Sequence, residues 1–155
     1  KGLSLVEGLR LAEVFHAELE TAQGGDPELD GAGRTLSRKG PPHIDRVVPD
    51  VSVSDLSAAV RQHTAVLGMD VLMDHGWIVT LGDGTGHQLS LMTTDATATV
   101  NPQVSVFVDD VHAAYRAALE ANTEIVHPLT EESWGVTRFF YRDSSGSVIN
   151  VGSHR

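Results

Sequence analysis

The sequence predicts an α+β fold in which one strand–helix–strand–strand–strand unit occurs twice. The stretch "VSVSDLSAAVR" at residues 51–61 recurs as "VFVDDVHAAYR" at residues 106–116. In both copies apolar residues alternate before an aspartate, Asp55 or Asp110, and follow helical spacing after it. Each copy is followed by three further short runs of strand-forming residues. Two such units lying side by side, with their helices outside, would form a curved sheet around a shared cleft.

The N-terminal residues precede this repeat and have a different pattern. Residues 1–23 predict an amphipathic helix, because Leu5, Leu9 and Leu19 recur at helical spacing. Residues 24–42 are rich in Gly and Pro and are typical of a linker. Since one helix cannot bury its own apolar stripe, we expect it to dock on the main domain or on a partner subunit.

The main domain is expected over residues 43–155, with units at about 43–93 and 100–153. Gly68 and Asn122 should end the two helices, since both residues tolerate the left-handed conformation common at helix C-termini. The strand candidates of the first unit are "DRVVPDVSV", "DVLMD", "WIVTL" and "HQLSLM". Those of the second unit are "QVSVFV", "EIV", "VTRFFYR" and "SVINV". The second unit also carries an insertion, "HPLTEESWG", which we expect to be a mobile loop above the cleft.

Composition restricts the classes of partner and chemistry. The chain has no cysteine, which excludes disulfides, thiolate zinc sites and cysteine nucleophiles. Its net charge of −10 disfavours nucleic acid and anionic membrane surfaces as partners. No apolar run reaches the roughly 18 residues of a membrane-spanning helix, and no signal peptide is recognisable. These features predict a cytoplasmic location.

Side-chain alternation predicts which residues line the cleft. If the "GDGTG" turn pairs residue 82 with residue 87, Trp77 lies opposite Met92 and Val79 opposite Ser90, on the cleft face. By the same reasoning Phe139 lies opposite Asn150. Rings beside polar groups suit a partly apolar ligand, although they would equally fill the join between two half-sheets. The predicted ligand-binding residues are Trp77, Ser90, Gln103, Trp134, Phe139 and Asn150.

His75 is the histidine best placed for acid–base chemistry. The stretch "MDHGW" puts it on a turn at the rim of the predicted cleft, where an imidazole can act as a general base near neutral pH. The alternative is an ordinary turn residue beside the flexible Gly76.

Three stretches, "SDLSAAVRQHTAVLGM", "VDDVHAAYRAALEAN" and "WGVTRFFYRDSSGSVINV", resemble the vicinal oxygen chelate superfamily. That superfamily covers glyoxalase I, extradiol dioxygenases and bleomycin-resistance proteins. The resemblance implies paired βαβββ units and a metal ligand on the first and last strand of each unit. Carried over, the ligand positions fall on Val48, Ser90, Gln103 and Asn150. Transition metals prefer imidazole, carboxylate or thiolate, so we expect no metal and no cofactor.

The sequence therefore predicts a metal-free protein that resembles this superfamily and binds a small organic molecule. One alternative is a glyoxalase-type lyase or isomerase acting on a small metabolite, with His75 as base or a metal held in an unfamiliar way. A dioxygenase fits less well. Another alternative is a regulatory or interaction subunit that uses the N-terminal helix. The resemblance and the uncovered leucine stripe also lead us to expect a homodimer.

Overall fold

The computed structural model describes residues 40–154. The helix expected at residues 1–23 and nearly all of the expected linker lie outside the described residues, so both stay predictions. In the described part, no helix is long and apolar enough to cross a membrane.

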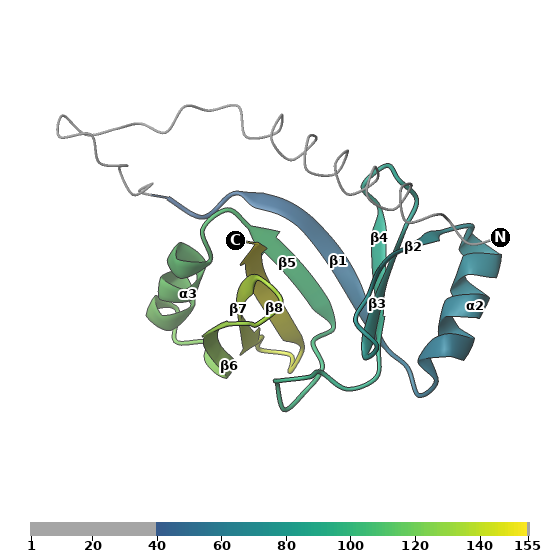
Figure 1. Cartoon of the computed structure of the whole chain (residues 1–155). Helices are drawn as coiled ribbons and strands as arrows, with labels where there is room; N and C mark the ends of the chain where they lie inside the picture. The colour runs from purple at the N-terminus through teal and green to yellow at the C-terminus, as the bar shows by residue number, and fades with distance from the viewer. Residues whose placement is uncertain (1–39, 155) are drawn as a thin grey trace. The chain divides into compact units, whose positions relative to one another are not determined.

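Two βαβββ units follow one another along the chain. The first consists of β1 (Ile44–Ser52), α2 (Leu56–Leu67), β2 (Asp70–Asp74), β3 (Ile78–Gly82) and β4 (Gln88–Met92). The second consists of β5 (Val104–Val108), α3 (Val111–Glu120), β6 (Glu124–Glu131), β7 (Val136–Arg142) and β8 (Val148–His154). The strands form one curved eight-stranded sheet in the order β2-β3-β4-β1-β5-β8-β7-β6, with α2 and α3 on its outer sides (Figure 1).

Strand register confirms the predicted duplication. β1 pairs with β4 in parallel, as β5 does with β8, and the antiparallel pair β1–β5 joins the two units. Val51 pairs with Leu91 in the first unit, and Val106 pairs with Val151 in the second. The two repeated valines therefore hold equivalent places on equivalent strands.

Both helices begin and end where the sequence predicts. The Asp55 side chain accepts a hydrogen bond from the Ala58 N–H at 2.9 Å, and Asp110 accepts one from Ala113 at 2.8 Å. These N-caps satisfy backbone donors that would otherwise lack a partner in the first turn. At the other end, Gly68 has a φ of 67°, a left-handed conformation that costs glycine little.

The outer face of each half-sheet forms an apolar core with its helix. In the first unit, Val79, Leu81 and Leu91 are buried against Leu56 and Val60 of α2. In the second unit, the core around α3 contains Val108, Val111, Tyr115, Phe139 and Val151. We call the opposite face of the sheet, turned away from α2 and α3, the inner face.

The segment of residues 93–103, which connects the two units, covers part of the inner face of the second unit. Ala98 of this segment is buried with Phe140 and Val148, and Val100 packs against the same cluster. The sequence did not predict this contact. Part of the expected cleft is therefore occupied by the chain itself.

The register of both predicted hairpins is wrong by one residue. Gly82 pairs with Gln88, so Ile78 lies opposite Met92 and Thr80 opposite Ser90, while Val79 faces α2. The turn is one residue longer than expected, because the Asp83 carboxylate accepts the backbone N–H groups of residues 85 and 87 and stabilises residues 83–87 as a wider turn. A one-residue change of register exchanges the two faces of a strand.

The same change affects the second hairpin. Asp143 accepts the backbone N–H groups of Ser145 and Ser147 at 2.8 and 2.9 Å, and Arg142 pairs with Val148. As a result Phe140, and not Phe139, lies opposite Asn150.

The insertion predicted as a loop at residues 127–135 is mostly strand. β6 continues to Glu131 and pairs with β7 through two irregularities in register, which accommodate the extra residues. Only residues 132–135, including Trp134, form the turn between β6 and β7. The additional residues therefore lengthen an edge strand.

Candidate functional site

A row of polar side chains crosses the inner face from one unit to the other. The hydroxyl oxygens of Thr80 and Ser90 are 3.0 Å apart on β3 and β4. Asp50 on β1 pairs with Ser90 across the β1–β4 ladder. The Ser105 hydroxyl donates a hydrogen bond to Asp50 Oδ2 at 2.6 Å, and Asn150 Nδ2 donates to Ser105 Oγ at 2.9 Å. Five neighbouring strands thus each contribute one polar group.

Two oxygens of this row lack a hydrogen-bond partner. Asp50 is 7% exposed and Asn150 is 6% exposed. Asp50 Oδ1 and Asn150 Oδ1 are buried and find no donor among the described residues. A buried acceptor without a donor costs roughly 1–3 kcal/mol, so buried polar groups are nearly always paired. Asn150 Oδ1 is an acceptor, as is Asp50 Oδ1 when the carboxyl is ionised, and both side chains are hydrogen-bonded to Ser105.

The surroundings of Asp50 favour its protonated form. Burial raises the pKa of this carboxyl from 3.8 to about 7, with a further increase from the nearby Asp95 carboxylate. The hydrogen bond from Ser105 and the charge of Arg138 oppose this rise. At neutral pH Asp50 therefore exchanges between a hydrogen-bond donor and an acceptor.

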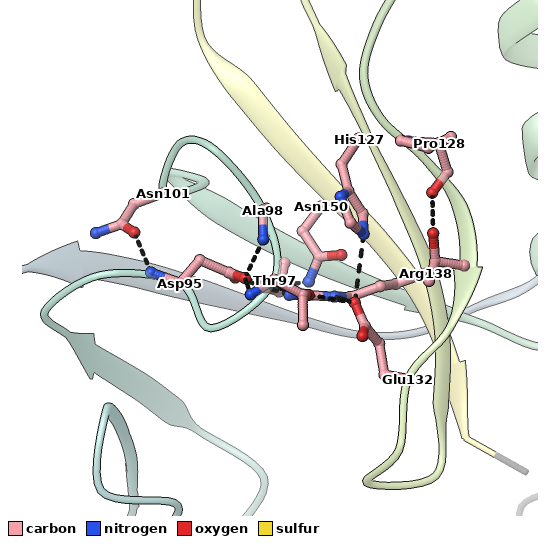
Figure 2. A network of polar contacts seen from close by, with 11 residues as sticks. Asp95, Thr97, Ala98, Asn101, His127, Pro128, Glu132, Arg138 and Asn150 are labelled. Carbon is pink, nitrogen blue, oxygen red and sulfur yellow. Dashed lines mark hydrogen bonds and ion pairs between the residues drawn. The ribbon is translucent and has the colours of Figure 1, made fainter.

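A buried network centred on Arg138 lies beside this row (Figure 2). Arg138 Nη1 and Nη2 donate to the two carboxylate oxygens of Asp95 at 2.9 and 2.7 Å, and Nε donates to Glu132 Oε1 at 2.7 Å. Burial of Asp95 acts to raise its pKa, but the bonds from Arg138 and from two backbone N–H groups outweigh burial, so the pKa is lowered. Because Asp95 belongs to the segment of residues 93–103, the ion pair attaches that segment to β7.

One end of the inner face carries a second cation. The Arg46 guanidinium lies over the Phe107 ring, with 4.0 Å from Cζ to the ring centroid. The His154 ring stacks on Phe107 at 5.0 Å, and its Nε2 is 2.7 Å from Arg46 Nη2. Burial and the neighbouring guanidinium lower the pKa of His154, which favours the neutral imidazole that can accept this bond.

Four of the six predicted ligand-binding residues belong either to the polar row or to a pair of aromatic rings. Ser90 and Asn150 belong to the polar row. Trp77 and Trp134 come from different units and meet edge to face, with ring centroids 5.8 Å apart. Arg138 Cζ lies 5.2 Å from the Trp134 ring. The tryptophan pair thus joins the two units beside the Arg138 network.

The remaining predicted site residues lie elsewhere. Phe139 packs against Tyr115 under α3, with ring centroids 5.0 Å apart, so its placement on the cleft face was wrong. Gln103 is exposed, and its side-chain oxygen accepts the backbone N–H of Val148. His75 is exposed on the turn between β2 and β3, as the sequence indicated.

The side chains on this face do not suit a transition metal. Of the positions implied by resemblance, Val48 is buried and apolar, and Ser90, Gln103 and Asn150 offer neutral oxygens only. Asp50, two residues beyond Val48, adds a single carboxylate. Over residues 40–154, no group of three or more His, Cys, Asp or Glu side chains is placed to hold a metal ion. A divalent transition metal requires stronger donors than these.

Sequence reasoning missed Asp50 and the pairing of Arg138 with Asp95. The available signal for Asp50 was alternation: Asp50 and Ser105 hold matching places in the two copies of the repeat, two residues beyond Val48 and Gln103. No comparable signal pointed to the Arg138–Asp95 pair, whose members lie 43 residues apart in the sequence.

Comparisons with known proteins agree with this architecture. A model of the Glyoxalase/Bleomycin resistance protein/Dioxygenase superfamily matches residues 42–151. A search of curated protein sequences finds no match.

Several solved structures share the fold. A superfamily member from Vibrio splendidus 12B01 is 19% identical, with a TM-score of 0.56 over 72% of this chain and 99% of that one. A structure from Legionella pneumophila, described as an NAD-dependent benzaldehyde dehydrogenase, is 14% identical, with a TM-score of 0.59 over 71% of this chain and 100% of its own. An extradiol ring-cleaving dioxygenase from B. fuscum is 18% identical, with a TM-score of 0.55, and the match covers 73% of this chain and 33% of the dioxygenase.

At these identities the structural matches establish the fold alone. The family match covers both repeated units, from the start of β1 to the last strand. The chain belongs to the Glyoxalase/Bleomycin resistance protein/Dioxygenase superfamily.

Proposed function

We propose that the inner face binds a small organic molecule through hydrogen bonds to Asp50 and Asn150, without a transition metal. The observation that carries this proposal is the pair of buried, unsatisfied oxygens, Asp50 Oδ1 and Asn150 Oδ1. Asn150 Oδ1 accepts hydrogen bonds, and Asp50 Oδ1 does so when the carboxyl is ionised, so the matching ligand carries donors such as hydroxyl or amine groups.

The energetics of the unliganded site support this proposal. Each unsatisfied buried oxygen costs roughly 1–3 kcal/mol, and a donor on the ligand removes that cost. A carboxylate accepting a bond from a protonated amine gains further, because charge-assisted bonds are about twice as strong as neutral ones. A polar row that is costly when empty and satisfied when occupied is expected of a binding site and not of a core.

The shape of the site limits what can bind. The segment of residues 93–103 already covers Phe140 and Val148 in the second unit, which leaves Ile78 and Met92 of the first unit as apolar neighbours of the row. Asp50 is itself buried, so a ligand reaches it only if the surrounding side chains rearrange on binding. The proposal therefore concerns a small ligand.

A second candidate function is proton-transfer catalysis of the lyase or isomerase type. The observation that favours it is the Asp50 carboxyl, whose pKa of about 7 is suited to general acid–base catalysis at neutral pH. Asp50 is a better candidate base than His75, because it is buried in the polar row while His75 is exposed on a turn. A regulatory role for the N-terminal helix stays a prediction, since residues 1–23 lie outside the described part.

The test is a thermal-shift comparison of matched probes that differ in their donors, benzylamine and benzoate, within a wider set of fragments. We expect amines and alcohols to raise the melting temperature of the wild type more than carboxylates do. Asp50→Asn and Asn150→Ala should each weaken the binding of such hits at least tenfold. Asp70→Asn, which changes an exposed carboxylate on β2, is the matched control and should bind like wild type. Hits that bind both site variants with wild-type affinity would refute the proposal.

A further inference from the structure

A pocket lies on the outer side of the sheet, between α2 and the β2–β3 hairpin, and its volume is about 440 Å³. Its apolar lining is Val71 of β2 and Val79 of β3 together with Leu56 and Val60 of α2. Its polar lining comes from exposed residues, Ser57, Arg61 and Asp74. Val79 faces α2 and not the polar row, so this pocket and the inner face lie on opposite sides of the sheet.

The internal duplication explains why the pocket exists. Val60 is the fifth residue after the N-cap Asp55, and Tyr115 holds the same place after Asp110. Val79 pairs with Leu91 on β4, and Phe139 pairs with Val151 at the matching place on β8. The equivalents of Val60 and Val79 in the second unit are therefore both aromatic.

In the second unit these two aromatic residues fill the space between helix and sheet. The Tyr115 and Phe139 rings meet edge to face with centroids 5.0 Å apart, and Phe139 is 1% exposed. In the first unit, Val60 and Val79 occupy the places of Tyr115 and Phe139. Leu56 and Val60 pack against the buried Val79, and the pocket opens beside them.

Packing of the two helices differs accordingly. α3 buries Val111, whereas no residue of α2 is buried within the described part of the chain. Apolar residues near the C-terminal end of α2 are also exposed to solvent; Val66, for example, is 74% exposed. The pocket is bordered by the exposed side chains of Arg61, Val71 and Asp74 and is therefore open to solvent, so a small molecule can enter it.

We propose that this pocket binds the aromatic ring of a small molecule, with the ring against Val60 and Val71, close to the place that corresponds to Tyr115 of the second unit. Polar substituents of the ligand then contact Arg61, Asp74 or Ser57. This site goes beyond the function proposed for the inner face, because it uses the other side of the sheet and none of the same residues.

The probe is p-cresol, which reproduces the side chain of tyrosine. In a titration of the isotope-labelled full chain followed by amide NMR, we expect saturable shifts centred on Leu56, Val60 and Val79. The dissociation constant should be on the order of 1 mM, as for other ligands of this size. Shifts centred on Asp50 and Asn150 would place p-cresol on the inner face and overturn the proposal, as would the absence of saturable shifts.

Three variants sharpen the test. Val60→Tyr supplies the missing ring from the protein itself and should weaken p-cresol binding at least tenfold. Val66→Tyr adds the same ring to an exposed position of the same helix and should leave binding within twofold of wild type. Val60→Ala enlarges the pocket and should retain binding. Unchanged affinity in Val60→Tyr, or an equal loss in Val66→Tyr, would refute the proposal.

Discussion

Replacing Asp50 by asparagine should stabilise the protein at alkaline pH and remove part of its pH dependence. Burial raises the pKa of this carboxyl from 3.8 to about 7. One pKa unit corresponds to about 1.4 kcal/mol, so the ionised form costs about 4 kcal/mol of folding free energy above pH 7. Asparagine removes this charge and keeps an oxygen that accepts the Ser105 hydrogen bond. The N–H groups of the new amide have no assigned hydrogen-bond partner, and this cost reduces the gain in stability by roughly 1–3 kcal/mol.

The sign of the pH dependence follows from proton linkage. Because the pKa of Asp50 is higher in the folded state, the native protein binds more protons than the unfolded chain between about pH 4 and pH 7. The contribution of the carboxyl to stability is therefore complete at low pH and is lost as the pH rises through this window. We expect Asp50→Asn to exceed the wild type by about 1–3 kcal/mol at pH 8.5 and to lose this advantage at pH 4.5.

The assay is urea unfolding of wild type, Asp50→Asn and the control Asp70→Asn at pH 4.5, 6 and 8.5. Other groups titrate over the same range, so the quantity to compare is the difference in unfolding free energy between each variant and wild type at each pH. A difference for Asp50→Asn that stays constant from pH 4.5 to 8.5 would refute the reasoning. So would an equal pH-dependent difference for Asp70→Asn.

Arg138→Met should destabilise the fold by about 3–5 kcal/mol, because it leaves the Asp95 and Glu132 carboxylates buried without their cation. Arg142→Met, at the partly exposed end of the same strand, should cost about 0–1 kcal/mol. Calorimetry measures the stability of both variants, and an equal loss of stability in the two would contradict the role assigned to the buried ion pair. Elemental analysis of the purified protein should find no stoichiometric zinc, nickel, manganese or iron; one metal per chain, lost on changing Asn150, would overturn the metal-free proposal. Sedimentation at micromolar concentration should show a homodimer, and a monomer whose state is unchanged after removal of residues 1–23 would contradict that expectation.

The order of helices and strands in the two repeated units could be predicted from the sequence because the signals for it are local. The N-caps Asp55 and Asp110 mark helix starts through bonds to residues three positions away, and Gly68 marks a helix end by its own backbone freedom. The duplication supplied a second, independent reading of every element. For the strand before each helix, where both copies gave the same pattern at Val51 and Val106, the structure agrees.

Which face of the sheet each residue of a hairpin strand lies on was harder to predict, because it depends on the length of the turn. In "RFFYR", Phe139 and Phe140 are adjacent and equally apolar, so composition does not decide which one faces the helix. The side chain of Asp143 widens the turn by one residue and so decides it. In the first hairpin the Asp83 side chain widens the turn in the same way, and the predicted register was wrong by one residue there too.

Asp50 and the Arg138–Asp95 pair were missed because their partners are distant in sequence. The Ser105–Asp50 bond spans 55 residues and the Arg138–Asp95 pair spans 43. An aspartate after a proline, as at Asp50, has the local pattern of a strand end or a turn. Only the pairing of β1 with both β4 and β5 places it in the centre of the sheet.

The central claim, that Asp50 and Asn150 form a ligand site on the inner face, is tested most directly by an NMR titration with the strongest amine or alcohol from the fragment comparison. The side-chain amide of Asn150 and the backbone amides of Asp50 and Ser105 should show the largest shifts, and these should saturate together with one dissociation constant. Saturable shifts elsewhere, with the Asn150 side-chain amide unmoved, would contradict the claim.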